Sequence, residues 1–317
     1  NDPTIAGSAN FNQENYTFGY GTGDLTVNRR AAQIIASAQE KDYGDVHDLG
    51  DIAFTVVDRD GGALPNGETV NAVTLVSADG IDASTDANAV LYADNISVTP
   101  TSTNDQTIAG SANFNQENYT FSYGTGDLTI NLANLTITGI TGGDKIYDDT
   151  IAATASGTAT LNGLVSDDDV SLGGSPVFTF ASSNVGTEIT INTTGYTING
   201  TDSGNYTLTQ PTLSGDITAK ELTITGITGS DKVYDGTTVA SASGTPVLSG
   251  VLSNDDVVLG GTPVFTFESA ELGTDIAITT TGFIITGSNN GNYTLTQPTL
   301  SADIVTTLGV DDITDVK

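Results

Sequence analysis

The sequence predicts an all-β fold built from tandem β-sandwich domains. Long internal repeats are the first observation behind this prediction. The second is that apolar residues alternate with Thr and other small polar residues along each repeat, which is the pattern of half-buried strands. The third is the spacing of Gly-, Asp-, Asn- and Ser-rich turn signals, about every 8 to 12 residues. About seven strands fit into each repeat, as in a two-sheet sandwich.

The C-terminal part of the chain contains one repeat written twice. LTITGITGGDKIYDDT begins at Leu135 and recurs as LTITGITGSDKVYDGT from Leu222, an offset of 222 − 135 = 87. GNYTLTQPTLSGDI at residues 204–217 recurs, with one change, at residues 291–304 and the same offset. No insertion disturbs the register. We therefore expect two domains of one fold, residues 135–221 and 222–308, followed by a short acidic tail, residues 309–317.

The N-terminal part carries a different repeat. TIAGSANFNQENYTFGYGTGDLTVN at residues 4–28 recurs almost unchanged at residues 107–131, an offset of 107 − 4 = 103. We therefore expect residues 1–28 to be the closing strands of a domain whose beginning is missing, and residues 29–134 to be a full domain of that type. RRAAQIIASAQE at residues 29–40 has helical character, but its place at the opening of its domain favours a strand.

The joints between the expected domains are short. TGDLTINLANLTITGI at residues 125–140 and SGDITAKELTITGI at residues 214–227 cross two boundaries without a Pro/Gly/Ser-rich linker. A connection of this kind leaves little freedom of angle between neighbours. We therefore expect the domains to form a stiff, elongated rod.

The charge balance excludes several partners. The chain has 8 Lys and Arg against 39 Asp and Glu, a formal net charge of −31. Such a chain repels nucleic acid and anionic membranes. No apolar run approaches the length that spans a bilayer. We expect neither nucleic-acid binding nor membrane insertion, and we expect neighbouring domains of a longer chain to be the main partners.

Residue types with catalytic chemistry are scarce. The chain has no Cys and a single His, His47. Thiol catalysis and Cys-based zinc sites are therefore excluded. A Ser-His-Asp triad could occur once at most, and the surroundings of His47 (GDVHDLG) do not resemble the setting of a nucleophile. We expect the protein not to be an enzyme.

A Lys-x-Tyr-Asp sequence recurs at one position of the repeat. We interpret it as a structural corner, in which a packed Tyr meets a turn whose amides are bound by the following Asp. A second interpretation is an isopeptide cross-link, which needs a buried Lys beside a carboxyl group that shuttles protons. The simpler alternative to a cross-link is a surface ion pair of Lys with Asp. The residues concerned are Lys145, Tyr147, Asp148, Lys232, Tyr234, Asp235 and Gly236.

Two acidic turns are candidate calcium sites. SDDDV at residues 166–170 and SNDDV at residues 253–257 gather carboxylates in a loop. Ca²⁺ takes six to eight oxygen ligands, so these turns supply part of a shell. The spacing matches no established calcium loop, and solvated turns are the alternative. The candidate ligands are Asp167, Asp168, Asp169, Asp255 and Asp256.

The chain resembles two related families of bacterial repeat domains. KVYDGT at residues 232–237 is preceded by LTITGITGSD, and its repeat closes with GNYTLTQPTLSADI at residues 291–304. This pattern is similar to the YDG family, although the first copy has Asp149 where the second has Gly236. AQEKDYGD at residues 38–45 and NYTFSYGTGDLTI at residues 118–130 resemble the MBG family. The resemblance implies tandem Ig-like β sandwiches from filamentous-haemagglutinin-like adhesins and biofilm matrix proteins of Gram-negative bacteria. It implies no active site.

These observations lead to one expected function and two alternatives. We expect a secreted or cell-surface spacer that separates a distal binding module from the cell. One alternative is that a domain, with residues 29–134 the better candidate, itself binds glycans or a host or abiotic surface. The other is that residues 1–28 pair with a like chain by strand addition, which would form a fibre.

Overall fold

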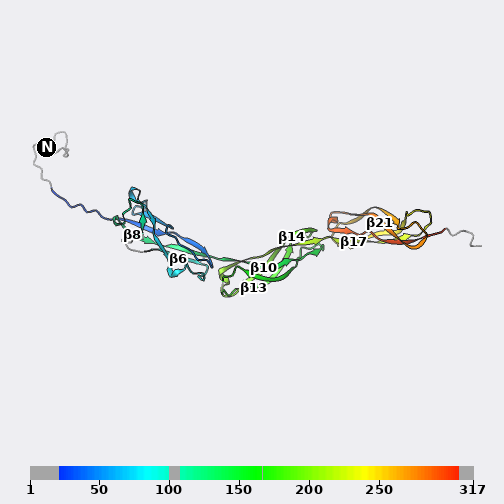
Figure 1. The fold of residues 1–317 in the computed structure, drawn as a ribbon, viewed down its shortest axis with the longest axis horizontal. Coiled ribbons are helices and arrows are strands. Elements are labelled where there is room, and N and C mark those ends of the chain that lie inside the picture. The colour runs from blue at the N-terminus through cyan, green and yellow to red at the C-terminus, as the bar shows by residue number, and fades with distance from the viewer. Residues whose placement is uncertain (1–20, 100–107, 166, 307–317) are drawn as a thin grey trace, which may run out of the picture. The chain divides into compact units, whose positions relative to one another are not determined.

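The computed structural model describes residues 21–99, 108–165 and 167–306, and it has the predicted all-β fold (Figure 1). Short 3-10 turns are the sole helical segments in the described residues. No helix in this part of the chain is long and apolar enough to cross a membrane. The chain divides into two compact units, Asn1–Asn131 (unit 1) and Leu132–Lys317 (unit 2).

Unit 1 contains two main sheets and one short strand pair. The sheets have the strand orders β3-β1-β8 and β2-β9-β6-β5, and β4 pairs with β7. Strand β1 occupies the segment for which the sequence favoured a strand over a helix, so that prediction is confirmed. The strands are β1 (Arg30–Ala36), β2 (Gln39–Asp42), β3 (Phe54–Asp58), β4 (Val70–Ala72), β5 (Thr74–Ser77), β6 (Leu91–Thr99), β7 (Ala109–Gly110), β8 (Tyr119–Gly124) and β9 (Gly126–Asn131).

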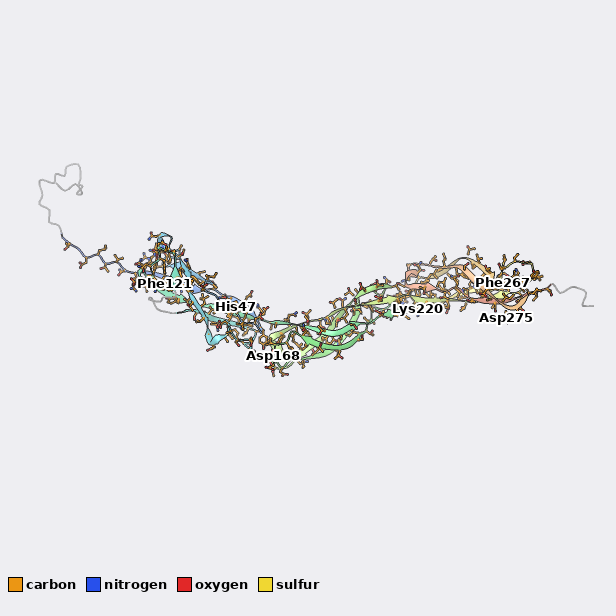
Figure 2. The ribbon with its side chains drawn as sticks, viewed as in Figure 1. His47, Phe121, Asp168, Lys220, Phe267 and Asp275 are labelled. Carbon is orange, nitrogen blue, oxygen red and sulfur yellow. The ribbon has the colours of Figure 1, made fainter. Side chains whose placement is uncertain are left out.

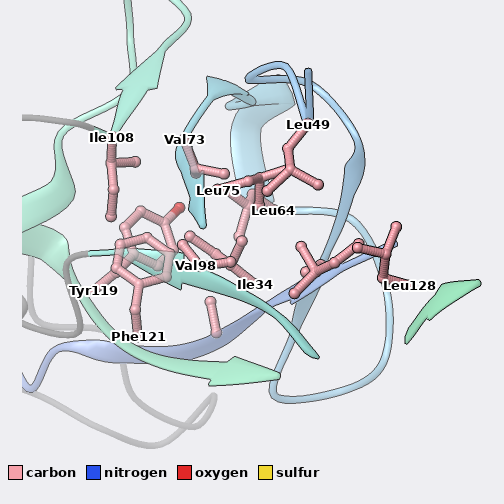
Figure 3. Close-up of a cluster of buried hydrophobic side chains, with 13 residues drawn as sticks. Ile34, Leu49, Leu64, Val73, Leu75, Val98, Ile108, Tyr119, Phe121 and Leu128 are labelled. Atoms are coloured by element: carbon pink, nitrogen blue, oxygen red, sulfur yellow. The ribbon is translucent and has the colours of Figure 1, made fainter. Parts of the chain in front are cut away.

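The core of unit 1 lies between its sheets and follows the strand alternation of the sequence. Along β9, buried and half-buried residues alternate, and Leu128 is one of the buried ones. Figure 3 shows Ile34 of β1 and the aromatic rings of Tyr119 and Phe121 within this cluster. The two rings stack with centroids 5.5 Å apart. Period-2 alternation therefore places one face of each strand in the core.

Unit 2 contains the two 87-residue copies. The first strand of each copy begins two residues before the start that we expected, at Ala133 and at Lys220. We call residues 133–219 repeat 1 and residues 220–306 repeat 2. Repeat 1 has the sheets β12-β10-β15 and β11-β16-β14-β13. Its seven strands are β10 (Ala133–Gly142), β11 (Lys145–Ile146), β12 (Ala155–Asn162), β13 (Ser171–Phe180), β14 (Gly186–Asn199), β15 (Tyr206–Thr209) and β16 (Thr212–Thr218).

Repeat 2 has the same topology as repeat 1. Its sheets are β19-β17-β22 and β18-β23-β21-β20, and labels in Figure 1 mark β17 and β21. The two main sheets of unit 1 follow the same order, so the three domains share one pattern of strand pairing. The seven strands of repeat 2 are β17 (Lys220–Ser230), β18 (Lys232–Val233), β19 (Ser241–Ser249), β20 (Val258–Phe267), β21 (Gly273–Thr286), β22 (Tyr293–Leu295) and β23 (Leu300–Val305).

Glycines allow close strand contact halfway along each repeat. Gly139 lies at the register shift between β10 and β12, next to the pair formed by Ile140 and Gly157, and both glycines have a positive φ. A Cβ atom on Gly139 would lie 2.3 Å from the carbonyl oxygen of Thr158. The β10–β12 register shifts at this point, which marks a β-bulge. Only Gly fits a bulge whose backbones approach so closely.

Each repeat has two ends, which we call its poles. The N-terminal pole holds the acidic turn and the 3-10 turn before β15 or β22. The C-terminal pole holds the Lys-x-Tyr-Asp corner and the end of β16 or β23. The connection between repeats is minimal, because β16 ends at Thr218 and β17 begins at Lys220. Lys220 is labelled in Figure 2.

Candidate functional site: the joint between the two repeats

The Lys-x-Tyr-Asp corner is built in the same way in both repeats. Lys145 donates to Asp148 Oδ1 at 2.6 Å and to the carbonyl oxygen of Thr150 at 2.6 Å. The same carboxylate accepts the backbone N–H of Thr150 at 3.0 Å. The ammonium group also lies 5.6 Å from the centroid of the Phe180 ring. The Asp thus organises the turn, while the Lys fastens the turn to the sheet.

In repeat 2, Lys232 donates to the carbonyl oxygen of Thr237 at 2.6 Å and lies 2.8 Å from Asp235 Oδ1. Hydrogen bonds from Lys232 and from Thr237 lower the pKa of Asp235 to about 2. In repeat 1, burial opposes such a shift, yet hydrogen bonds from Lys145 and Thr150 still hold the pKa of Asp148 below its usual value. The contacts of both lysines are those of hydrogen-bonded ion pairs, the simpler of the two interpretations of these residues.

The tyrosines of the two corners lie in different surroundings. The side chain of Tyr147 is 1% exposed, whereas that of Tyr234 is 47% exposed. Their backbones are alike: the N–H of Tyr147 donates to the carbonyl oxygen of Thr218 at 2.8 Å, and that of Tyr234 to Val305 at 2.9 Å. A packed Tyr at the corner was expected in both repeats, but the structure packs only Tyr147. The difference arises because repeat 2 covers the C-terminal pole of repeat 1.

The acidic turn of repeat 2 supplies the main polar contact of this joint. The hydroxyl group of Tyr147 donates to Asp255 Oδ1 at 3.2 Å, and that of Tyr293 donates to Asp255 Oδ2 at 2.5 Å. The two tyrosine rings meet edge to face with their centroids 5.4 Å apart. A single carboxylate therefore joins a tyrosine from each repeat.

A second contact of the joint runs through Asn292, which is 7% exposed. Its side-chain oxygen accepts the backbone N–H of Val185 at 2.9 Å, and its amide group donates to Asn184 Oδ1 at 3.1 Å. The apolar cluster beneath is continuous across the boundary: Ile217 of β16 and Leu222 of β17 belong to the same core. We define the joint as Tyr147, Asn184, Val185, Asp255, Asn292 and Tyr293.

The joint changes the acidity of its tyrosines. Burial and the hydrogen bond to Asp255 raise the pKa of Tyr147 to about 12. Burial, followed by Asp255, also raises the pKa of Tyr293. Both effects favour the neutral phenol, because a phenolate would be desolvated next to a carboxylate.

The five candidate calcium ligands serve largely as hydrogen-bond acceptors in turns. Asp168, labelled in Figure 2, accepts the hydroxyl of Tyr206 at 2.5 Å, the counterpart of the Asp255–Tyr293 bond. Asp169 and Asp256 accept the backbone N–H groups of Thr201 and Ser288. Asp167 has a φ of 72°. In the described part of the chain, no group of three or more Asp, Glu, His or Cys side chains is placed to hold a metal ion. Calcium binding stays a prediction.

Unit 1 has its own version of the corner, in which the lysine is buried. Lys41 is 7% exposed and donates to four backbone carbonyl oxygens: those of Asp45, Ile81, Asp82 and Ser84. Desolvation lowers its pKa, although Asp82 and Asp45 oppose this. The charged group thereby ties the segment around residues 81–84 to the end of β2. Tyr43 follows Lys41 at the Lys-x-Tyr spacing of the corner, and Lys41 was not among the residues that the sequence singled out.

Unit 1 also contains a pocket of about 280 Å³ beside β3 and β4. Ile52, Phe54, Val56 and Leu64 form its apolar wall, and Glu68 and Asn71 are polar residues of its lining. Glu68 accepts the hydroxyl of Tyr119 at 2.8 Å. His47 does not line this pocket, and its Nε2 atom lies 2.8 Å from Gln39 Oε1.

The comparison with family models identifies the two repeats. The model described as YDG domain matches residues 131–213 and 218–300, two copies offset by 218 − 131 = 87 residues. Neither a curated protein nor a solved structure matches the chain.

Proposed function

Because the chain belongs to the YDG domain family, we propose that it is a non-enzymatic spacer segment of a secreted or cell-surface bacterial protein, an adhesin or a biofilm matrix fibre. In this proposal its domains hold a binding module away from the cell. The observation that supports it most directly is the joint, where buried contacts and a single intervening residue, Ala219, connect repeat 1 to repeat 2. A buried joint resists bending, which is what a spacer requires.

The strand lengths fit the same function. β14 and β21 each contain 14 residues, which is about 45 Å at roughly 3.3 Å per residue. The long axis of each sandwich is thus spanned by a single strand. The high negative charge adds to the proposal, because like charges keep a long surface protein soluble and limit unspecific adhesion.

Distance measurements between spin labels test the stiffness of the joint in the full chain. The protein has no Cys, so Ser175→Cys and Thr262→Cys introduce two labels at matched, exposed positions, one in each repeat. We expect one narrow distance distribution. Asp255→Asn should broaden it, and Asp256→Asn, next to it but outside the joint, should not. A broad distribution in the parent chain would contradict a stiff spacer.

A second candidate function is ligand binding by unit 1, and the pocket beside β3 and β4 favours it. Its apolar wall and its polar residues Glu68, Thr69 and Asn71 suit a sugar ring that presents both a hydroxyl edge and a C–H face. A glycan array probed with the full chain tests this function. Binding that is lost in Asn71→Ala and kept in Asn113→Ala would support it, and an array without any signal would exclude the glycans tested.

A third candidate is strand exchange by the N-terminal repeat. Residues 1–20 lie outside the described residues, but Leu25 and Val27 are 88% and 83% exposed, whereas their repeat counterparts Leu128 and Ile130 are buried in β9. A second chain could pair with such a segment. Light scattering over a concentration series tests this: association that Leu25→Asp abolishes would support strand exchange, and a monomer at all concentrations would contradict it.

A further inference from the structure

The C-terminal pole of repeat 2 repeats the surface that repeat 1 uses in the joint. Tyr234 and Leu272 correspond to Tyr147 and Val185 by the offset of 87, and they are 47% and 50% exposed. Val305, which corresponds to Thr218, adds a third apolar side chain that is 43% exposed. We call the C-terminal pole of repeat 2, where these three side chains are exposed, the open pole.

We propose that the open pole is a docking site for the N-terminal pole of another YDG-type domain, one that carries Tyr, Asp and Asn at the positions of Tyr293, Asp255 and Asn292. This inference rests on the proposed spacer function. It also states which chemistry the partner must bring: a tyrosine ring to pack on Tyr234, a carboxylate to accept its hydroxyl, and an amide side chain to bind the backbone N–H of Leu272.

The open pole already has the geometry of the occupied one. Lys232 binds Thr237 at 2.6 and 3.1 Å, the same distances at which Lys145 binds Thr150. Lys232 lies 5.7 Å from the centroid of the Phe267 ring, compared with 5.6 Å in the first corner. A partner would therefore meet a preformed surface, which reduces the entropy lost on docking.

Two substitutions between the poles favour docking. Asp149 lies close to the hydroxyl of Tyr147, with its Oδ1 atom 3.4 Å away, and so shares that hydroxyl with Asp255. In the open pole its counterpart is Gly236, which removes the repulsion between two carboxylates at this point. Asn184 is replaced by Glu271, a charged and therefore stronger acceptor for an incoming amide group.

The apolar substitutions act in the same direction. Leu272 replaces Val185 and Val305 replaces Thr218, so a partner that covers the open pole buries more apolar surface than repeat 2 buries on repeat 1. Covering these exposed apolar side chains with a complementary domain is energetically favourable, because it removes them from water. Repeat 2 itself shows which kind of domain is complementary, because its own N-terminal pole covers the equivalent surface.

The experiment extends the full chain by one domain. Residues 307–317 are replaced by a second copy of residues 220–306, so that the new junction at Thr306 has the spacing of the junction at Ala219. The added copy carries Tyr234→Phe, so that tetranitromethane can nitrate only the original Tyr234 at this position. Nitration at Tyr234 and at Tyr147, mapped by mass spectrometry, is the measurement, and a chain ending at Thr306 is the control.

We expect Tyr234 to be nitrated readily in the chain ending at Thr306, and its nitration to fall to the level of Tyr147 in the extended chain. Asp255→Asn in the added copy should restore part of the reaction. If Tyr234 is nitrated as readily in the extended chain as in the chain ending at Thr306, the added copy does not cover the pole. That result would overturn the proposal. Protection of Tyr234 by residues 307–317 in the natural chain would assign the pole to the chain's own end and would also overturn it.

The same data separate this inference from the proposed function. Tyr147 is the internal reference, because it reports on the existing joint in every variant. If Tyr147 is nitrated as readily as Tyr234 in the chain ending at Thr306, the joint is loose and the spacer function fails. If Tyr147 is protected while Tyr234 stays reactive in the extended chain, only the docking inference fails.

Discussion

The two C-terminal poles of unit 2 have nearly the same sequence and the same backbone, but one is covered and the other is open. Tyr147 and Tyr234 occupy equivalent positions, each followed by an Asp that binds the turn, and each lies near a Lys held over a Phe ring. Their exposed fractions are 1% and 47%. The difference comes from the neighbouring repeat, since Asp255 and Tyr293 contact Tyr147.

This comparison separates two roles of one motif. The contacts of the Lys and the Asp stay within the repeat in both copies, with one further bond from Lys232 to the carbonyl oxygen of Val239, so these residues stabilise the corner itself. The Tyr projects outward, and its contacts belong to the joint. A substitution of the Lys or the Asp should therefore affect either repeat alike, whereas a substitution of the Tyr should depend on what covers the pole.

The largest expected effect is the loss of the buried ring. Tyr147→Ala should destabilise the joint by about 3–5 kcal/mol, because it leaves a cavity between two packed repeats. Tyr234→Ala should cost about 1 kcal/mol or less, because the ring is half exposed. Hydrogen exchange of each repeat during urea unfolding measures both. Equal effects of the two substitutions would show that the joint does not form in solution.

Alkaline pH should weaken the joint next most strongly. The pKa of Tyr147 is about 12 in the folded protein, above the value of about 10 for an unfolded chain. Its contribution is fully present below pH 10 and is lost as the pH rises through 12. A shift of this size corresponds to about 2–3 kcal/mol. The stability of the joint, measured between pH 9 and pH 12, should fall less steeply in Tyr147→Phe than in the parent chain.

Asp255→Asn should weaken the joint by about 1–3 kcal/mol, because the acceptor of two tyrosine hydroxyls loses its charge. The reactivity of Tyr147 toward tetranitromethane should increase accordingly. Asp256→Asn is the matched control, since Asp256 binds the turn at Ser288 and not the joint. If both variants behave alike, the carboxylate of Asp255 has no specific role between the repeats.

Asp149→Gly should have the smallest effect and the opposite sign. It makes the first corner resemble the second, where Gly236 stands. Asp149 has a φ of 63°, which disfavours a side chain by roughly 1 kcal/mol, and its carboxylate repels Asp255. We therefore expect a gain in stability of about 1 kcal/mol by thermal unfolding. A loss would show that the contact of Asp149 with Tyr147 stabilises the joint.

Some features of the structure could not be inferred from local patterns. Glu188 and Asp275 have φ values of 50° and 52°, and their backbone N–H groups donate to Asp216 and Asp303. Asp275 is labelled in Figure 2. Both residues lie at β-bulges, where the register of the strand pair shifts. The carboxylate that supports each bulge comes from the neighbouring strand, so the sequence of one strand alone does not predict the bulge. Lys41 escaped attention for the same reason, because three of its four acceptors lie about 40 residues away in the sequence.

The sequence alone determined the 87-residue period, the seven strands of each repeat and the residues of the corner. Period-2 alternation and turn residues are local, and a repeat that keeps both in register forms the same local structure twice. Only the tertiary structure decided that Asp255 and Asn292 meet Tyr147 and Val185, and that Tyr147 is buried while Tyr234 is exposed. Burial is a property of what lies next to a side chain, and two identical stretches of sequence can have different neighbours.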